Sequence, residues 1–433
     1  MKAFESIVAL GGLSSSDGKT LISDGLHTCL NLRPTGGGLV RFKKPVLVSD
    51  KVRYPFPQKW EGNKFAFTVT PETVFVSSSE TFRNTGKFFE FFDFHNFVLG
   101  ISEDNVLYRN VAERSFSYGM CNFIPTGVSA LNYSGQLIVG GVTNGWNGLP
   151  PSAICWSRIG IADFTLDSSN VAGYAILQKV NRVFKLLLFG GVIFVYTDTG
   201  MFKCKPSGLA FGFVCVNSIA AVHKDAIAGS NSRQIFFATD GYLYQVTSDE
   251  VKKLGYSWLA DKLNVLKMRI ICNEATQDFY ITDGNRTFVL CDFGMFQTTI
   301  VPNCFYNDSL IGSMTCVGVD GKDLLGFETG WLSFSRLGLK TLESFDLLIS
   351  PVPSDYLLLC KTEVLGSSVY SKICTLGDNL STTPVITGNR FKISYFAPYA
   401  STDILEIAGL KTRVKYTDRR NYRAGGGNFE TAQ

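Results

Sequence analysis

Apolar and polar positions along the chain follow one recurring arrangement: a short apolar or aromatic run, a polar turn containing Asp, Asn or Gly, and a second apolar run. Such runs predict β-strands, and two runs joined by a short turn predict a hairpin. Apolar residues at helical spacing are scarce, and the best helical candidate, 257–267, is short. We therefore expect a chain that is nearly all β.

The clearest copies of this hairpin pattern lie in the second half of the chain. They pair 192–196 with 201–204, 234–238 with 242–244, 278–281 with 287–290, and 324–327 with 331–334. The turn residues are Asp198, Gly200, Asp240, Gly241, Asp283, Gly284 and Gly330, and the four glycines are 41, 43 and 46 residues apart. Gly and Asp suit these positions because a tight turn requires a positive φ angle, which Gly adopts freely and Asp tolerates.

Looser copies of the pattern lie upstream. They pair 97–101 with 106–108, 136–139 with 152–156, 64–69 with 73–77, and 29–32 with 39–42. A period of about 40 to 45 residues with one hairpin per unit is typical of β-propeller blades. A lone hairpin cannot bury its apolar face, whereas a ring of blades buries the faces and protects most edges. We predict a propeller of six or seven blades; a β-sandwich with evenly spaced turns is the alternative.

The pattern changes near the C-terminus and suggests a division of the chain. We expect residues 1–60 to form an N-terminal segment that joins the propeller or a ring of subunits, 61–342 the propeller core, and 343–433 a small β-rich appendage. The last stretch of the appendage is rich in Lys and Arg, and we predict that it is a flexible docking arm. Its candidate docking residues are Arg413, Lys415, Arg419, Arg420 and Arg423. A solvated terminus, docking on an acidic protein and contact with DNA phosphates all remain open for it.

Composition narrows the classes of function. Charged residues make up 18% of the 433 residues, against a usual ~25%, and hydrophobic residues make up 45%. Such a chain can bury ample apolar surface, which excludes intrinsic disorder. A net charge of +4 argues against a protein that coats nucleic acid. The shortage of charge suggests that part of the surface is covered in an assembly.

Cysteines and apolar stretches point to a reducing compartment without a membrane span. The 11 cysteines include no Cys-x-x-Cys pair, so we expect free thiols. Glu5 interrupts the start of the chain, which does not resemble a secretory signal. The most apolar stretch, 186–196, is too short to cross a bilayer.

Motifs for catalysis are weak or absent in the sequence. Residues 12–20 have five residues between Gly12 and Gly18, whereas a phosphate-binding loop has four, so a polar turn is the simpler interpretation. His27, His95 and His223 have no neighbours at metal-ligand spacing. The Asp turns also lack the full pattern of the Asp boxes found in propeller glycosidases. We therefore expect no enzyme, no cofactor and no metal.

Two stretches carry a resemblance to a known family. The first, within 29–41, is an Asn-x-Arg-Pro-x-x-Gly turn formed by Asn31, Arg33, Pro34 and either Gly36 or Gly37. The second is a Trp-Ser strand that leads through Gly into Asp-Phe, followed by the hairpin 192–204. Its motif residues are Trp156, Ser157, Gly160, Asp163 and Phe164. Together these stretches resemble the tail hub or tail nozzle proteins of short-tailed bacteriophages, also described as DNA-stabilisation proteins.

The resemblance implies a structural virion protein with a β-propeller fold. Such proteins are expected to form a homohexameric ring below the portal and its adaptor, to bind tail fibre or spike proteins, and to be assembled in the bacterial cytoplasm. The ring would hold packaged double-stranded DNA and conduct it at ejection without sequence-specific contacts. A carbohydrate-binding or glycoside-processing propeller, or a scaffold propeller for protein interactions, is the alternative function.

In this interpretation the motif residues are structural. We expect Trp156 to pack between blades, and Gly160 to form a turn that Asp163 closes.

Overall fold

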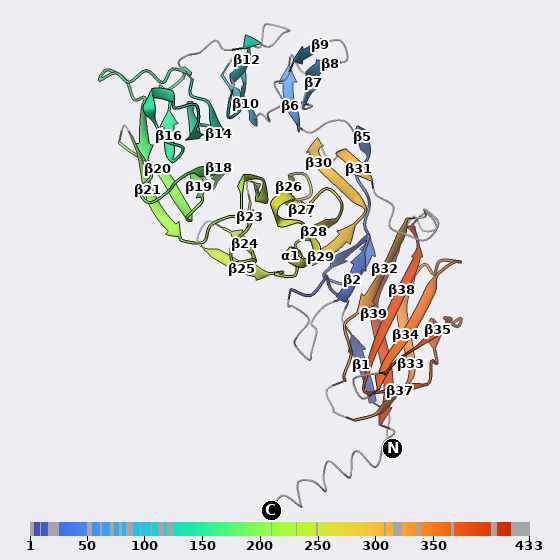
Figure 1. Cartoon of the computed structure of the whole chain (residues 1–433). Coiled ribbons are helices and arrows are strands. Elements are labelled where there is room, and N and C mark those ends of the chain that lie inside the picture. The colour runs from blue at the N-terminus through green and yellow to red at the C-terminus, as the bar shows by residue number, and fades with distance from the viewer. Residues whose placement is uncertain are drawn as a thin grey trace, which may run out of the picture.

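The computed structural model is almost entirely β (Figure 1). It describes residues 4–8, 10–15, 26–49, 54–60, 63–69, 73–77, 80–83, 90–95, 97–104, 106–110, 117–118, 124–208, 210–230, 232–247, 250–306, 309–314, 323–334, 338–364, 368–399 and 405–416. Within these residues, seven small sheets follow one another as the blades of a propeller. The last strand of blade six also pairs with a strand of the appendage, so that these two sheets are continuous. The predicted fold class, an all-β propeller with a β-rich appendage, is confirmed, with seven blades.

Six blades have four antiparallel strands each. Blades one to three consist of β6–β9 (Tyr54–Trp60, Asn63–Val69, Thr73–Ser77, Glu80–Arg83), β10–β13 (Glu90–Phe94, Phe97–Ile101, Val106–Asn110, Ser117–Tyr118) and β14–β17 (Gly127–Tyr133, Gln136–Val142, Ala153–Trp156, Gly173–Ile176). Blades four to six consist of β18–β21 (Val183–Phe189, Val192–Thr197, Met201–Ser207, Ala210–Asn217), β22–β25 (Ile227–Gly229, Gln234–Phe237, Leu243–Val246, Val251–Gly255) and β26–β29 (Arg269–Asn273, Asp278–Thr282, Thr287–Cys291, Gly294–Thr298).

The seventh blade shows how the ring closes. It combines β30 (Ile300–Tyr306) and β31 (Ser309–Met314) with β5 (Leu47–Ser49), which comes from the N-terminal segment and pairs parallel to β31. The first strand of each blade contacts the first strand of the next, and β30 of blade seven contacts β6 of blade one. The ring is therefore closed by neighbouring blades and by a strand from the other end of the chain.

The hairpins predicted between 64 and 290 are confirmed as the second and third strands of successive blades. The turn before Gly200 shows why the local sequence specifies them. The Thr197 hydroxyl accepts a hydrogen bond from the Gly200 N–H at 3.1 Å and donates one to the Gly200 carbonyl at 2.8 Å. Gly200 has a φ of +156°, and a Cβ there would collide with the carbonyl of Asn217. Turn chemistry and backbone space together require glycine at this position.

Short helical segments are few within the described residues. They are α1 (Leu259–Lys262) and the 3₁₀ turns η1 (Trp146–Gly148), η2 (Lys224–Ala226) and η3 (Val265–Lys267). α1 and η3 fall within the predicted helical candidate 257–267.

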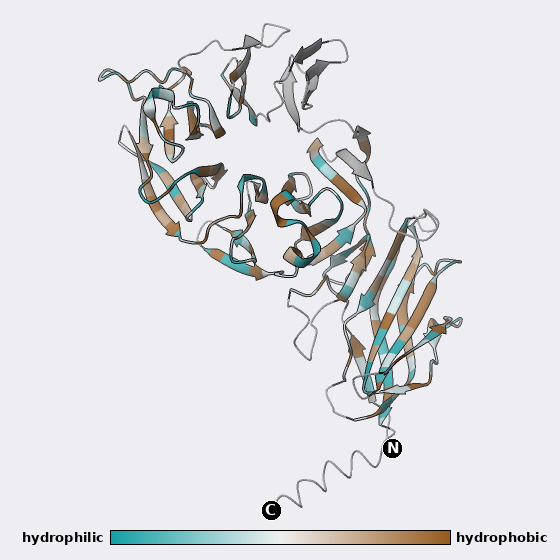
Figure 2. Cartoon of the chain, viewed as in Figure 1, coloured by the Kyte–Doolittle hydropathy of each residue, from teal (hydrophilic) through white to brown (hydrophobic). Residues whose placement is uncertain are grey.

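The appendage consists of two sheets packed face to face. One contains β1 (Phe4–Val8), β3 (Leu32–Thr35), β4 (Gly38–Arg41), β33 (Lys340–Ser350), β36 (Ser381–Thr382), β37 (Ile386–Gly388) and β39 (Glu406–Tyr416). The other contains β2 (Leu26–Leu30), β32 (Leu324–Thr329), β34 (Leu357–Val364), β35 (Ser368–Cys374) and β38 (Arg390–Pro398). Apolar residues of both sheets belong to one buried cluster, which also includes residues of blades five and six. Figure 2 shows apolar residues alternating with polar ones along these strands.

Two of the predicted hairpin copies belong to this appendage and not to the propeller. The segment 324–334 is not a hairpin, because β32 pairs with β2 on one side and with β38 on the other. Gly330 follows β32 and is buried. The hairpin in 29–42 does form, as β3 and β4, but β4 pairs with β39. In both cases a long strand from the C-terminal region offers a partner that spacing along the sequence does not reveal.

The basic stretch near the C-terminus also differs from the prediction. Arg413 and Lys415 lie in β39, an eleven-residue strand that pairs with β1, β4 and β33, so this part is not a flexible arm. Their side chains lie 3.5 Å and 3.7 Å from the Glu343 carboxylate. Alternating apolar residues on β39 are buried in the sandwich, and this burial holds the strand in place. Arg419, Arg420 and Arg423 lie outside the described residues.

Candidate functional site

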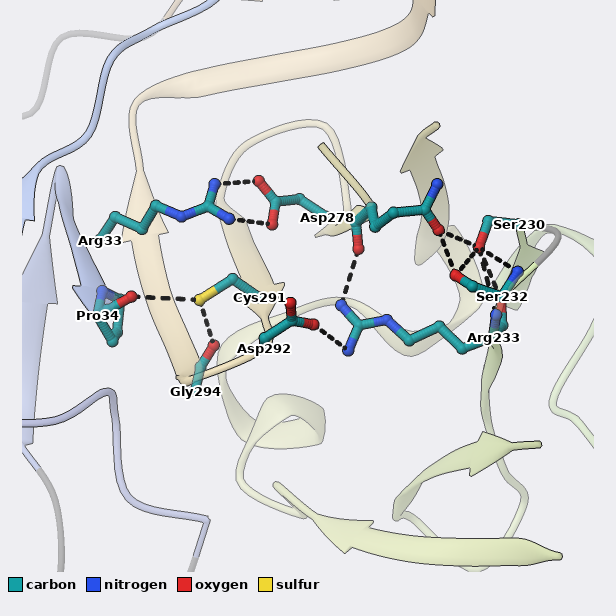
Figure 3. A network of polar contacts seen from close by, with 10 residues as sticks. Arg33, Pro34, Ser230, Ser232, Arg233, Asp278, Cys291, Asp292 and Gly294 are labelled. Carbon is teal, nitrogen blue, oxygen red and sulfur yellow. Dashed lines mark hydrogen bonds and ion pairs between the residues drawn. The ribbon is translucent and has the colours of Figure 1, made fainter. Parts of the chain in front are cut away.

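The first motif of the resemblance lies where the appendage meets the propeller. β3 carries Arg33 to the side of blade six, where its guanidinium makes two parallel hydrogen bonds with the Asp278 carboxylate of β27, at 2.5 Å and 3.0 Å (Figure 3). The Asp278 side chain is 2% exposed and that of Arg33 is 29% exposed. Such a bidentate pair fixes orientation as well as distance, so it joins the two modules in one geometry.

Burial raises the pKa of the Asp278 carboxyl, and the nearby Arg33 guanidinium opposes part of this rise. For Arg33, burial alone would lower the pKa, but the Asp278 carboxylate outweighs it and raises the pKa. The two pKa shifts have the same origin: the Asp278 carboxylate is removed from water, and the Arg33 guanidinium is the charge that stabilises its ionised form.

A second ion pair extends the same network, as Figure 3 shows. Arg233 lies 3.1 Å from the Asp292 carboxylate and donates to the carbonyl of Gln277 at 2.8 Å. The Gln277 side-chain oxygen accepts hydrogen bonds from Ser230 and Ser232, both at 2.5 Å. These contacts link blade five to blade six beside the Arg33–Asp278 pair. Blade six, which contacts the appendage, is therefore also held by its neighbour in the propeller.

Asn31 is the buried centre of the junction. Its side-chain amide donates to the carbonyl of Leu324 at 2.7 Å, and its side-chain oxygen accepts from the Thr298 hydroxyl at 3.0 Å. Its backbone N–H donates to the Gln297 carbonyl at 2.8 Å, and its φ is +51°, a conformation that Asn tolerates better than most residues. One side chain therefore bridges blade six and the appendage strand β32, using both the donor and the acceptor of the Asn amide.

Lys44 adds a third contact at the junction. Its ammonium group pairs with Asp323, donates to the Thr299 hydroxyl at 2.5 Å, and lies 4.4 Å from the centre of the Tyr399 ring. Asp323 also accepts a hydrogen bond from Asn31. Sequence reasoning missed Asp323 and Asp278 because they are far from the motif in sequence, and it missed Lys44 because both of its polar partners, Thr299 and Asp323, are equally distant.

The structure also shows which glycines form the turn of the first motif. Gly36 and Gly37 form the two-residue turn between β3 and β4, and neither has a positive φ. Gly38 has a φ of +138°, and a Cβ there would collide with the carbonyl of Ile407. The strict requirement for glycine is therefore at Gly38, which the motif does not include. Pro34 lies on β3, and its carbonyl faces the Cys291 thiol at 3.8 Å.

The second motif lies between blades three and four. The Trp156 ring is buried, packs edge-on against Phe211 of β21 at 5.2 Å, and donates from Nε1 to the Val171 carbonyl at 2.9 Å. A Cβ on Gly173 would approach the Trp156 ring to 2.7 Å. The indole therefore fills the space between two blades and requires glycine on the adjacent strand.

The residues after Trp156 form a compact turn. The Ser157 hydroxyl donates to the Arg158 carbonyl at 2.8 Å. The Arg158 N–H donates to the Asp163 carbonyl at 2.9 Å, and the two side chains pair at 3.5 Å. Gly160 has a φ of +80°, and Phe164 is buried in the core of blades two and three. Every residue of this motif thus has a packing or turn-forming role.

Two of the turn aspartates accept hydrogen bonds from the segment that leads into their blade, and the third accepts one within its blade. Asp198 accepts from the backbone and side chain of Asn181 at 3.1 Å and 2.8 Å, and Asp283 accepts from the Asn264 N–H at 3.1 Å. Asp240 accepts from a tyrosine hydroxyl of β24 at 2.7 Å. Burial opposes ionisation of Asp283, but backbone N–H donors outweigh it and lower its pKa. Gly241 and Gly284 have φ angles of +82° and +93°.

An ion pair that sequence reasoning missed spans the ring. Glu103, in the turn after β11 of blade two, lies 2.5 Å from the ammonium of Lys224, which is in η2 just before blade five. Blades two and five are not neighbours in the ring. The pair therefore links opposite sides of the propeller.

A polar cluster lies on the second sheet of the appendage. The Glu328 carboxylate contacts Lys361 at 3.2 Å, Lys392 at 3.0 Å, the Ser394 hydroxyl at 2.8 Å and His27 at 3.2 Å. The hydrogen bond from His27 is the largest cause that lowers the pKa of Glu328; burial opposes it, and Lys392 and Ser394 add to the lowering. The arrangement stabilises the charged form of the Glu328 carboxylate.

The three histidines are far apart. His27 is on β2, His95 contacts the Phe94 ring at 4.7 Å in blade two, and His223 contacts the Val265 carbonyl at 3.0 Å. Among the residues that the structure describes, no three His, Cys, Asp or Glu side chains are grouped as ligands for a metal ion. The described helices are all too short or too polar to cross a membrane.

Comparison with known proteins finds only distant structural similarities. No protein-family model and no curated protein matches the chain. A quinonprotein alcohol dehydrogenase-like protein from Bacteroides thetaiotaomicron aligns over 62% of this chain and 65% of its own, with 10% identity and a TM-score of 0.33. The extracellular domain of a hybrid two component system from the same species aligns over 77% and 45%, with 10% identity and a TM-score of 0.42.

The computationally designed Ika8 protein aligns over 82% of this chain and all of its own, with 10% identity and a TM-score of 0.32. The chain spans less than two thirds of both Bacteroides proteins. Similarity at this level of identity establishes no enzymatic activity.

Proposed function

We propose that this chain is a structural, non-catalytic virion protein of the tail hub or nozzle type of short-tailed bacteriophages. In the tail it forms a ring of identical copies, six by the resemblance, below the portal and its adaptor. The ring retains packaged DNA, conducts it at ejection, and carries fibre or spike proteins.

The observation that carries the proposal is the role of the first motif. Asn31 and Arg33, which define the resemblance, are the residues that fix the appendage to the propeller through buried contacts with blade six. A ring subunit that holds DNA under pressure needs its propeller and appendage to keep a fixed relative position. Bidentate and buried polar contacts hold two modules in such a position. This mechanical role of the motif supports the proposal.

The second motif supports the same proposal. Trp156 fills the space between blades three and four, and the turn that follows it is closed by its own hydrogen bonds. These residues stiffen the propeller. A glycan-processing propeller would instead be expected to direct carboxylates into one mouth of the ring.

The ion pair between Glu103 and Lys224 bears on the path of the DNA. Because it joins blades on opposite sides of the propeller, the axis of a single propeller is a poor conduit for a duplex. In the proposal the DNA passes through the centre of the ring of copies, and each propeller is a solid segment of its wall. A net charge of +4 on 433 residues allows passage without tight binding.

Two measurements test the proposal. Sequencing the DNA beside the gene is expected to find portal, coat and terminase reading frames; genes for sugar metabolism or signalling there would contradict it. Immunogold labelling with an antibody against this chain is expected to mark one end of each particle, at the tail. Particles without label, together with retention of the purified chain on a glycan array, would favour the carbohydrate-binding alternative.

A further inference from the structure

Two strands leave open edges with exposed apolar side chains. β21 is the outermost strand of blade four, and β35 is the last strand of the second appendage sheet. Within the described residues, neither strand has a partner on its outer side. An open edge presents a row of unpaired N–H and C=O groups that can pair with another strand.

The edge of β21 lacks the usual protection against such pairing. Its eight residues, Ala210–Asn217, include no charged residue and no proline. Val214 is 67% exposed and Val216 is 38% exposed. By contrast, the outermost strand of blade five carries Lys252 and Lys253, and that of blade six is covered by β2. Charges and covering strands are the ordinary means of blocking an edge, and β21 has neither. The four-residue β17 of blade three also lacks them, but it is half the length of β21.

The edge of β35 has a similar character. Val369, Tyr370 and Ile373 are 59%, 63% and 69% exposed, and the strand has seven residues. The ammonium of Lys372, its one charged side chain, is held by the carbonyl of Pro384 at 2.6 Å. A hollow of ≈ 440 Å³ lies beside the strand end, lined by 372–377 and 381–384.

The two edges lie at opposite ends of the molecule: β21 is on the left of Figure 1 and β35 on the right. We propose that β21 of one copy pairs with β35 of the next copy, so that the two sheets become continuous across the interface. The two strands are similar in length, with eight and seven residues, and both carry exposed apolar side chains. Unlike surfaces at opposite ends give head-to-tail association, which closes into a ring when the rotation per copy allows it. This inference rests on the proposed function, for which it names the lateral contact.

Cys215 provides a native probe, because it is exposed and lies on β21. We would introduce Val369→Cys, Ser371→Cys and Ile373→Cys one at a time on β35, and oxidise the purified protein at high concentration. At least one of the three is expected to give a ladder of covalent dimers and larger species on a non-reducing gel. The ladder should disappear when Cys215→Ser is combined with the same substitution.

A second variant tests the same edge without cysteine chemistry. Val214→Lys places a charge on β21 and should abolish the ladder in the cross-linking background, whereas Leu266→Lys, at a position 87% exposed on η3, should leave it unchanged. Unchanged melting temperatures of the lysine variants would show that both still fold. The pairing is overturned if no β35 cysteine links to Cys215, or if Val214→Lys and Leu266→Lys have equal effects.

The outcome separates this inference from the proposed function. A missing ladder with tail labelling in the virion would reject the strand pairing alone. A ladder without any virion label would keep the pairing and reject the tail assignment.

Discussion

Replacing Arg33 with alanine is the most direct test of the junction. The substitution leaves the Asp278 carboxylate, which is 2% exposed, without its guanidinium partner. Removing one member of a buried ion pair costs about 3 to 5 kcal/mol because the remaining charge is uncompensated. Arg33 is 29% exposed, so water reaches the gap and the lower end applies. We expect the free energy of unfolding to fall by about 3 kcal/mol near neutral pH.

The loss should depend on pH with a definite sign. Burial already raises the pKa of Asp278, and without Arg33 it would rise further. A carboxyl whose pKa is raised in the folded state is harder to ionise there than in the unfolded chain. The folded protein therefore keeps its full stability below the ordinary pKa of 3.8 and loses stability as the pH rises through the raised pKa. The difference between wild type and Arg33→Ala should therefore be smaller in acid than at neutral pH.

Urea unfolding, followed by circular dichroism and by tryptophan fluorescence, measures both effects at about pH 4.5 and about pH 7. Coincident curves from the two probes are needed before a single free energy is assigned. Arg158→Ala is the matched control: its contact with Asp163 is 3.5 Å long and part-exposed, and it should change stability by less than about 1 kcal/mol. An Arg33→Ala loss no larger than the control's, or one equal at both pH values, would refute the reasoning.

Three further changes can be predicted from the structure. Trp156→Ala should cost about 3 to 5 kcal/mol in thermal or urea unfolding, since the ring is buried between two blades; an unchanged melting temperature would contradict this. Gly200→Ala should lower stability by about 3 kcal/mol, because its Cβ would strike the Asn217 carbonyl, whereas Gly241→Ala, which has open space, should cost about 1 kcal/mol; equal costs would count against the role of that contact. Glu328→Gln should cost about 2 kcal/mol near neutral pH, where the carboxylate binds its lysine partners. The pKa of Glu328 is lowered in the folded chain, so the stability it contributes is present above its ordinary pKa of 4.5 and is lost as pH falls; the variant's stability should therefore vary less with pH in acid, and an identical profile would argue against this.

Local chemistry explains why much of the propeller could be predicted. The hairpins at Gly200, Gly241 and Gly284 form because the residues that bend the chain are adjacent in sequence, and turn preferences act over that short range. Their regular spacing then indicates repeated blades, since one hairpin alone cannot bury its apolar face. The packing role of Trp156 follows in the same way, from a large apolar ring at the end of a buried strand.

The number of blades and their boundaries could not be predicted in this way. The segment 324–334 has the same local pattern as a blade hairpin, yet β32 pairs with β2 and β38, which are far away in sequence. The third strand of blade seven comes from 47–49 and pairs with a strand more than 250 residues later. Competition among distant edges decides such pairings, and no local spacing records it.

The junction shows the same division between sequence and structure. The sequence by itself determined that a tight glycine turn follows Asn31 and Arg33, because a turn is set by adjacent residues. Only the tertiary structure decided that Arg33 meets Asp278, 245 residues away, and that Gly38 is the glycine the backbone cannot replace. An ion pair acts over a few ångströms of space, and the fold alone determines which charges come that close.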